Sequence, residues 1–399
     1  MNICGIVCEY NPFHNGHLFH IEESKRRGAD AIICVMSGNF VQRGDFAIMH
    51  KLARAEAAVR CGADIVIELP LPWSISSAEL FAYGAVSVLA RLGVVRSLSF
   101  GAETDDVQAL TQTAVLLKSE AVSAKISDEY ATGISYATAR ENALRSICPE
   151  LAEIIKSPNN ILGVEYLKAI SSLNSKIRPI AVTRSGAAHD SDFPAGNIAS
   201  ASALRELIHS GKDFAAFMPS QAFSIYNREH NLGAAPVFSE TADKAMMSVL
   251  KRFSAKDFKK YNDVSEGLQF RLLEAVSRES SLPSVIAYCK TKRYAHARLR
   301  RIFLNAFLGC EGKFSRGRVP YARILAFNDT GRKIIKDAKK HASIPIITKP
   351  SAIKKESKKA QDLFALERRA DDIYSLFMES PLAQGSTLTC SPIYVPENH

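Results

Sequence analysis

The sequence predicts an α/β protein in which a Rossmann-like, doubly wound parallel sheet is followed by a basic, mainly helical C-terminal domain. Three observations support this prediction. Short apolar runs alternate with helical periods over the first hundred residues, strand patterns cease after about residue 240, and the basic excess falls in the second part of the chain. A chain of 399 residues suggests two or three domains, and we divide this one into residues 1–240 and 241–399.

Apolar runs in the first hundred residues predict buried strands, at Ile3–Cys8, Ala31–Met36, Asp64–Leu69 and Ser97–Phe100. Helical periods lie between them, at Gly16–Arg27, Lys51–Cys61 and Ser77–Leu92. Strands that are apolar along their whole length and alternate with helices indicate a parallel sheet covered on both faces. Ligands of such sheets bind beyond the carboxyl ends of the strands, so we expect the functional site in the segments that follow them.

The remainder of the chain is predicted to be helical, with one further strand. Residues 106–175 show helical periods with a break at Ser157–Asn160, and a fifth strand is expected at Ile177–Arg184. A helix then begins at Ser200. Beyond residue 240 we expect helices only, at Lys244–Phe253, Ser265–Arg278, Ser284–Leu308 and Val319–Phe327.

Composition and charge restrict the class of protein. Hydrophobic residues make up 47% of the chain and charged residues 23%, which is ordinary globular composition and argues against a disordered or fibrous protein. The net charge of +10 is uneven, because residues 1–240 carry 21 basic and 25 acidic side chains whereas residues 241–399 carry 30 and 16. The basic part therefore suggests a polyanionic partner, and the alternative is a solvated, lysine-rich helical surface.

The sequence shows no sign of a membrane or secreted protein. No apolar run approaches the roughly 18 to 20 residues of a membrane span, and the N-terminus lacks the basic segment of a signal peptide. The eight cysteines include no C-x-x-C pair and no Cys/His cluster with zinc-site spacing. We therefore expect a cytoplasmic protein with buried thiols, no contact with membranes and no metal site of its own.

The strongest chemical signal is an H-x-G-H motif, His14-Asn15-Gly16-His17, directly after the first strand and at the start of a helix. Two imidazoles at this spacing lie beside the unpaired amides of a helix N-terminus, which together form a site for phosphate oxygens. Gly16 leaves room for a nucleotide close to the backbone. The motif therefore indicates stabilisation of charge on an α-phosphate while pyrophosphate is displaced, and the alternative is a pair of helix-capping histidines.

A second anion-binding pattern, S-x-S-x-x-R, is formed by Ser200, Ser202 and Arg205 at another predicted helix start. Two hydroxyls and a guanidinium at a helix N-terminus favour a phosphate ligand. The alternative is an N-cap followed by a surface arginine.

Together these motifs resemble the nucleotidyltransferases related to class I aminoacyl-tRNA synthetases. More specifically, the chain resembles the bacterial tRNA(Met) cytidine acetate ligase family over most of residues 1–210, and more loosely beyond. The strings that carry the resemblance are Val7 to Leu18, Met36 to Gly44, Ile65 to Pro70, Ser157 to Gly163, and Arg184 with His189-Asp190.

The resemblance implies an activity. Such enzymes activate acetate with ATP, giving acetyl-adenylate and pyrophosphate, and transfer the acetyl group to the wobble cytidine of elongator tRNA(Met), giving N(4)-acetylcytidine. The resemblance leaves open whether Mg²⁺ is required. The family's ATP contacts, transferred by motif, are Val7, Cys8, Glu9, Tyr10, Asn11, Pro12, Phe13, His14, Asn15, Gly16, His17, Leu18, Phe19, His20, Gly101, Asn159 or its neighbour Asn160, and Arg184.

The implied roles divide the site into a catalytic part and a nucleotide-binding part. His14, His17 and Arg184 are the catalytic candidates, of which the two histidines hold phosphates and the arginine clamps a phosphate or the acyl-adenylate. Gly101 admits the adenosine close to the backbone, and Asn159 bonds to the nucleotide. Ser200, Ser202 and Arg205 complete the phosphate pocket.

Two further segments are weighed between function and structure. The polar loop that contains Ser37, Asn39, Gln42 and Arg43 either shapes the acetate or cytidine pocket or is a structural turn. In the basic part, a helix over residues 290–301 would place Lys290, Arg293, Arg300 and Arg301 broadly on one side, with Tyr294 as a stacking ring. We favour RNA contact there over a solvated helix face.

Three other functions are considered. A small-metabolite cytidylyl- or adenylyltransferase would share the chemistry of the first 210 residues but has no need of the basic helical part. A non-catalytic RNA-binding protein is disfavoured by the intact motifs. An aminoacyl-tRNA synthetase is disfavoured because no loop similar to K-M-S-K-S is found.

Overall fold

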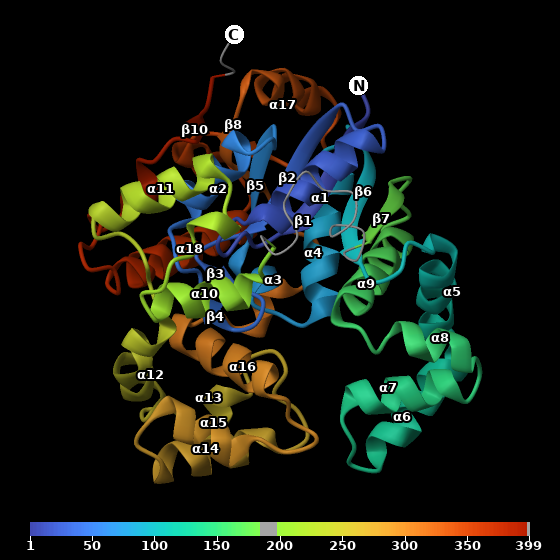
Figure 1. Ribbon diagram of the computed structural model, residues 1–399. Coiled ribbons are helices and arrows are strands. Elements are labelled where there is room, and N and C mark those ends of the chain that lie inside the picture. The colour runs from blue at the N-terminus through green and yellow to red at the C-terminus, as the bar shows by residue number, and fades with distance from the viewer. Residues whose placement is uncertain (184–197, 397–399) are drawn as a thin grey trace.

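The computed structural model describes residues 1–183 and 198–396, and its centre is a mostly parallel, eight-stranded sheet (Figure 1). The strands are β1 (Ile3–Cys8), β2 (Ala31–Ser37), β5 (Ile65–Leu69), β6 (Val95–Ala102), β7 (Arg178–Thr183), β8 (Ala322–Phe327), β9 (Ile346–Ile347) and β10 (Ile393–Tyr394). Their order is β10-β8-β5-β2-β1-β6-β7, and β9 pairs with β8. A separate hairpin consists of β3 (Phe40–Val41) and β4 (Asp45–Phe46).

The strand order places a switch point beside β1. The chain adds β2 and β5 on one side of β1 and then crosses over to add β6 and β7 on the other side. The pairings within this group are all parallel, so the carboxyl ends of five strands share one edge of the sheet. Loops diverge at such a point and leave the crevice in which doubly wound sheets bind ligands. The predicted Rossmann-like sheet is confirmed.

Helices cover both faces of the sheet because alternate side chains of its strands are apolar. Ile3 of β1 joins the core on one face, whereas Cys4, Ile6 and Cys8 join the core on the other. The first face packs against α3 (Leu71–Ser74), α4 (Ala78–Arg91), α9 (Pro158–Ser172), α17 (Asp329–His341) and α18 (Lys358–Ser375). The second packs against α1 (Asn15–Arg26), α2 (Lys51–Arg60), α10 (Ala201–His209) and α11 (Ser220–Asn231).

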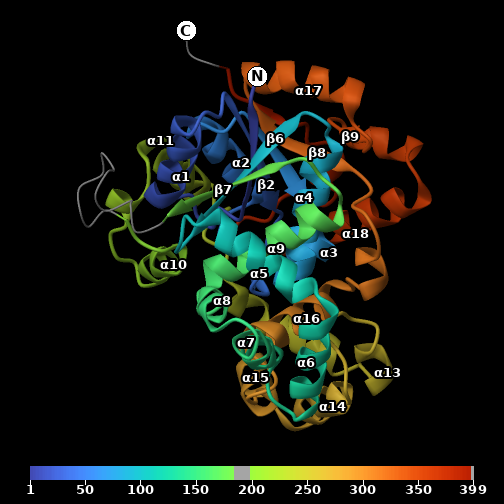
Figure 2. The same ribbon diagram turned by 90° about the vertical axis from the view of Figure 1, so that its right-hand side faces the viewer.

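Two helical lobes extend from the sheet at the lower end of the view in Figure 1. The first lobe follows β6 and contains α5 (Val107–Lys118), α6 (Glu120–Ala131), α7 (Tyr136–Arg145) and α8 (Pro149–Ile154). The second contains α12 (Asp243–Leu250), α13 (Ala255–Phe258), α14 (Leu268–Arg278), α15 (Leu282–Cys289) and α16 (His296–Leu308). Figure 2 shows both lobes below the sheet. They contact each other, since Tyr130 Oη donates to Glu266 Oε2 at 3.1 Å and Arg293 lies over the Tyr130 ring at 4.7 Å.

Two expectations about the second part of the chain are wrong. Val319–Phe327 is not a helix, because Ala322–Phe327 forms β8, which pairs antiparallel with β5. A short apolar run of this length fits a buried strand and a buried helical turn equally well, so its periodicity could not decide. The helix expected over Ser284–Leu308 is interrupted by residues 290–295, which join α15 to α16. The sheet thus takes strands from both sides of residue 240.

A buried ionic cluster fixes this returning segment to the N-terminal strands. Lys51 Nζ lies 2.6 Å from Glu68 Oε1 and 2.6 Å from Asp371 Oδ2, and Arg323 Nη1 lies 3.2 Å from Glu68 Oε2. Asn39 Nδ2 donates to the other oxygen of Asp371 at 2.8 Å. Each buried charge has an opposite partner, and removal of one partner would leave an uncompensated charge.

Among the described residues, no helix is both long and apolar enough to cross a membrane.

Glu367 on α18 is a buried acidic residue near this ionic cluster, and its pKa is raised. Its Oε1 accepts from Leu71 N at 3.1 Å and its Oε2 accepts from the Tyr321 hydroxyl. Burial, with the nearby Glu68 carboxylate, raises the pKa of Glu367 to about 8. Between its unfolded pKa and pH 8, the folded protein therefore holds a proton that the unfolded chain releases, so a rise in pH lowers stability.

We expect Glu367→Gln, which keeps the shape and an acceptor oxygen, to remove this dependence. Relative to the variant, the unfolding free energy of the parent protein should fall by about 1.4 kcal/mol per pH unit between pH 5 and 8. Urea denaturation at several pH values measures this difference. Parallel pH profiles for the two proteins would show that Glu367 is ionised in the folded state.

Candidate functional site

The segment after β1 makes a tight turn into α1. Tyr10 has a φ of 47° and the Asn11–Pro12 peptide bond is cis. The Asn11 side chain holds this turn, because its Oδ1 accepts a hydrogen bond from Ile48 N at 2.8 Å. The turn therefore delivers His14 to the first position of the helix, as the N-cap residue.

His14 and His17 cap α1 reciprocally. His14 Nδ1 accepts from Gly16 N at 3.1 Å, and His17 Nδ1 accepts from His14 N at 3.2 Å. The two rings stack with their centroids 3.6 Å apart. A ring nitrogen that accepts a hydrogen bond carries no proton, so the proton of each neutral imidazole is on Nε2. The helix-capping alternative is therefore confirmed, and the contact of the same rings with phosphate stays a prediction.

Aromatic side chains fix the position of His17. The Tyr10 and Phe13 rings lie 4.8 and 5.6 Å from the His17 ring, and both are buried. Gly16 lies close against the His14 ring, since a Cβ there would be 3.0 Å from His14 Cε1 and would press on the ring. The residue types of the motif are thus set by the close packing of the two rings.

Arg54 joins the strand ends on which this turn is built, and the sequence analysis did not identify it. Its guanidinium, fully buried, donates to the carbonyl oxygens of Glu9, Ser37 (3.1 Å) and Gly38, while its Nε donates to Met49 O at 2.9 Å. These carbonyls lie just beyond β1 and at the end of β2. The only signal in the sequence was a basic residue within an otherwise alanine-rich helix.

The S-x-S-x-x-R segment lies beside the same turn. Ser200 Oγ caps α10 by accepting from Ala203 N at 3.1 Å, which agrees with the N-cap alternative. Arg205 is not simply a surface residue, because its Nη1 donates to Asn11 O at 2.8 Å and its Nη2 to Ser202 Oγ at 3.2 Å. The Arg205 guanidinium is thereby held at the carbonyl of Asn11, which precedes His14 by three residues.

The end of β6 lies on the other side of the switch point. Gly101 lies there in register with Val182 of β7. Asn160 is buried and bonded twice to the backbone and side chain of Glu103, with Oδ1 accepting from Glu103 N at 2.8 Å. Asn159 is half-buried, and its Nδ2 donates to Glu103 Oε1 at 2.6 Å. Glu103 was not singled out from the sequence, although it follows a strand at the expected edge.

Other predicted residues have separate positions. His20 Nε2 lies 2.9 Å from Ser99 Oγ, which joins α1 to β6. Phe19 is buried, whereas Leu18 is half-buried. Arg184, with His189 and Asp190, lies outside the described residues.

The polar loop 37–43 is mainly structural. Asn39 is buried and binds both Asp371 and the amide of Lys51. The Gln42 amide donates to Glu9 Oε1 at 2.7 Å, and burial raises the pKa of Glu9. Arg43 is exposed. The structural alternative therefore holds for Asn39 and Gln42.

The basic segment differs from the expected helix face. Arg298 donates to Asp263 O at 2.7 and 3.0 Å, and Arg301 pairs with Asp263 Oδ2 at 3.1 Å. Arg293 pairs with Glu266 at 2.6 Å, and Arg300 pairs with Asp45 at 2.9 Å. These arginines hold loops of the protein, and Lys290 lies in the link between two helices rather than on one helix.

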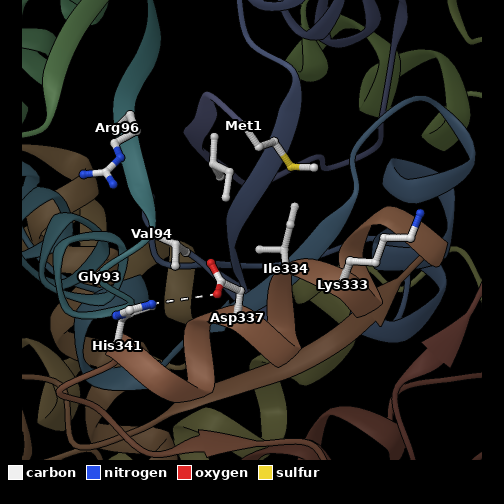
Figure 3. Close-up of a pocket in the computed structure, with 9 residues that line it drawn as sticks. Met1, Gly93, Val94, Arg96, Lys333, Ile334, Asp337 and His341 are labelled. Atoms are coloured by element: carbon white, nitrogen blue, oxygen red, sulfur yellow. Dashed lines mark ion pairs between the residues drawn. The ribbon is translucent and has the colours of Figure 1, made fainter.

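A cavity of about 400 Å³ lies at the opposite edge of the sheet, where β1 and β6 begin (Figure 3). Met1, Arg96 and Ile334 line it, and His341 pairs there with Asp337 at 3.8 Å. None of the motif residues borders this cavity, so the site described above is not there. In residues 1–183 and 198–396, no three His, Cys, Asp or Glu side chains gather in a way that could hold a metal ion.

Comparisons with known proteins agree with this geometry. A family model described as HIGH Nucleotidyl Transferase matches residues 1–387. A tRNA(Met) cytidine acetate ligase of Acetivibrio thermocellus is 38% identical over 399 residues, covering 96% of each chain, and one of Clostridium kluyveri is 37% identical, covering 99% of each. A crystal structure of Thermotoga maritima TmcAL bound with alpha-thio ATP is 32% identical, with a TM-score of 0.93 over 100% of both chains. The chain is therefore a HIGH nucleotidyl transferase and a member of the tRNA(Met) cytidine acetate ligase family.

Proposed function

We propose that this protein forms acetyl-adenylate from acetate and ATP and transfers the acetyl group to the wobble cytidine of elongator tRNA(Met). The observation that carries the proposal is the reciprocal pair of histidines at the switch point of the sheet. Full-length relatives named tRNA(Met) cytidine acetate ligase and the likeness to an ATP-analogue complex support it. The eight free thiols suit the reducing cytoplasm in which tRNA is modified.

The first step is displacement at phosphorus. A carboxylate oxygen of acetate attacks the α-phosphorus, the bond to the β-phosphate oxygen breaks, and pyrophosphate leaves. His14 and His17 would donate Nε2–H groups to the phosphate oxygens, and the N-terminus of α1 would add its dipole. Arg205 lies where it can hold a further phosphate oxygen. No protein nucleophile is needed, because positioning and charge stabilisation suffice for this chemistry.

The second step is acyl transfer to nitrogen. The exocyclic amine of cytidine attacks the acetyl carbon, the bond to the AMP oxygen breaks, and the amine loses a proton. The product is N(4)-acetylcytidine, and AMP leaves. Acetyl-adenylate is a reactive mixed anhydride of acetate and AMP, so alignment of the base with the acyl carbon is the main requirement.

The RNA would approach the second helical lobe. Its arginines at 293, 298, 300 and 301 are engaged with the protein's own acidic groups and carbonyls, as described above. Lys290 and Lys292 are exposed in the link between α15 and α16. We therefore propose that these two lysines, rather than the arginine face, make the phosphate contacts in this part of the chain.

The test is incubation with ATP, labelled acetate and elongator tRNA(Met), with and without Mg²⁺. Label in RNA that depends on ATP supports the proposal. The small-metabolite transferase would instead move a nucleotide to a small acceptor and leave the RNA unlabelled, and that result would exclude acetyl transfer.

We predict that His14→Ala and His17→Ala each lower acetate-dependent ATP–pyrophosphate exchange by about 10²- to 10³-fold, because a transition-state donor is lost. His14→Asn separates capping from catalysis, since its Oδ1 can cap the helix while no group replaces Nε2–H. It should keep the parental melting temperature and still lose exchange. Normal exchange in His14→Asn would mean that His14 acts only as a cap.

We predict that Lys290→Ala combined with Lys292→Ala weakens tRNA binding in a salt-dependent way. Each lost phosphate contact should reduce the slope of log K against log salt by about 0.9. Filter binding at several salt concentrations measures this slope. The matched control replaces Lys336 and Lys339 on α17, which are equally exposed but lie at the other end of the molecule. An equal effect of both pairs would indicate general charge attraction only.

A further inference from the structure

A small cavity lies between the β3–β4 hairpin and the second helical lobe. Its volume is about 140 Å³, and buried apolar side chains of Phe46, Met246, Ile286 and Leu304 form part of its wall. Pockets for whole cofactors or drug-sized ligands usually have about 300 Å³ or more. This cavity therefore suits a single flat ring rather than a complete nucleotide.

Carboxylates of Glu240 and Asp243 also border the cavity. Within the described part of the chain, neither side chain makes a hydrogen bond or ion pair, although Asp243 is half-buried. Burial, together with the neighbouring Glu240, raises the pKa of Asp243. A ligand that brings N–H groups would give this half-buried carboxylate hydrogen-bond donors that the described residues do not supply.

The other border of the cavity is cationic. Arg300 lines it and is held in place by Asp45 at 2.9 Å and by Ser239 Oγ at 3.2 Å. His296 also lines it, and burial together with Arg300 and Lys290 lowers the pKa of His296. Lys290 and Arg300 are thus close enough to this border to influence it. One side of the cavity therefore carries carboxylates that can accept hydrogen bonds from N–H groups. The other side carries positive charge, which attracts phosphate.

The cavity adjoins the ATP-site turn through the hairpin. Gly44 lines it, and a Cβ at Gly44 would lie 2.5 Å from Arg301 N, so hairpin and α16 touch through backbone. Two residues earlier, the Gln42 amide binds Glu9 Oε1 at 2.7 Å, just before the H-x-G-H segment. A ligand in the cavity would therefore lie beside the site rather than in it.

We propose that this cavity binds one unstacked, amino-bearing nucleobase of the RNA substrate, with its phosphate against Lys290. Proteins recognise single-stranded RNA loops by splaying bases into such pockets and bonding to their polar edges. Carboxylates accept from exocyclic amines, as they do from the N4 amine of cytosine. The inference rests on the proposed function, because it requires RNA as the substrate.

The test measures tRNA affinity of the full-length protein by filter binding with an elongator tRNA(Met) transcript. Asp243→Asn and Glu240→Gln keep side-chain shape but weaken acceptance from an amine, and each should raise the Kd about five- to tenfold. The control is Asp128→Asn on α6, whose carboxylate is exposed and makes no hydrogen bond or ion pair among the described residues. Its loss of negative charge should leave the Kd unchanged or lower it, because RNA is a polyanion.

The direction in which the Kd for tRNA changes decides whether the proposed nucleobase site stands. Cavity variants that bind tRNA as well as the control variant, or more tightly, would overturn the proposal. Thermal unfolding and acetate-dependent ATP–pyrophosphate exchange, measured without RNA, show that each variant is folded. Failure of the parent protein to label RNA would refute the proposed function itself, whereas a parent that labels RNA alongside unaffected cavity variants would refute only the nucleobase site.

Discussion

The buried guanidinium of Arg54 is the interaction on which the site depends. Strands of a parallel sheet diverge at their carboxyl ends, and the carbonyls there have no ladder partner. Arg54 supplies donors to such carbonyls beyond β1 and β2, so both loops leave the sheet in fixed directions. One loop becomes the turn into α1, and the other becomes the β3–β4 hairpin. The hydrogen bonds of Arg54 therefore anchor both the loop that carries the histidines and the hairpin that contacts the second helical lobe.

The two histidines show how one pair of side chains can serve structure and chemistry together. Their Nδ1 atoms replace the serine or aspartate oxygens that usually cap helices. In a neutral ring this capping places the proton on Nε2. Capping of the first turn and the proposed contact with phosphate therefore use different nitrogens of the same two rings.

Secondary structure could be predicted from the sequence in those parts of the molecule where the local residue pattern and burial in the fold agree. β1, β2 and β5 are mostly apolar and buried, so their identity and parallel pairing could be predicted. The H-x-G-H segment was placed correctly because a strand precedes it directly. β8 was missed because a short, mostly apolar segment of six residues is too brief for its periodicity to separate strand from helix.

Prediction of the site from the sequence was limited mainly by side chains whose partners lie far away in the chain. Asn39 looked like a pocket residue, yet it binds Asp371 more than three hundred residues away. The arginines of α16 were expected to contact RNA, yet Asp263 and Asp45 hold them. Arg54 had no signature, because its partners are backbone carbonyls that any sequence provides. Such residues can be recognised only when the fold brings their partners together.

The antiparallel strand β8 has a consequence for how the protein is made. It covers the edge of β5, but it lies more than two hundred and fifty residues later in the chain. During synthesis, β5 therefore keeps an open edge while the helical lobes emerge, and Glu68 lacks the partner charge of Arg323. The edge of β5 is covered only after Ala322–Phe327 has been synthesised, so a chain released before that point would leave an unpaired strand edge open to other chains.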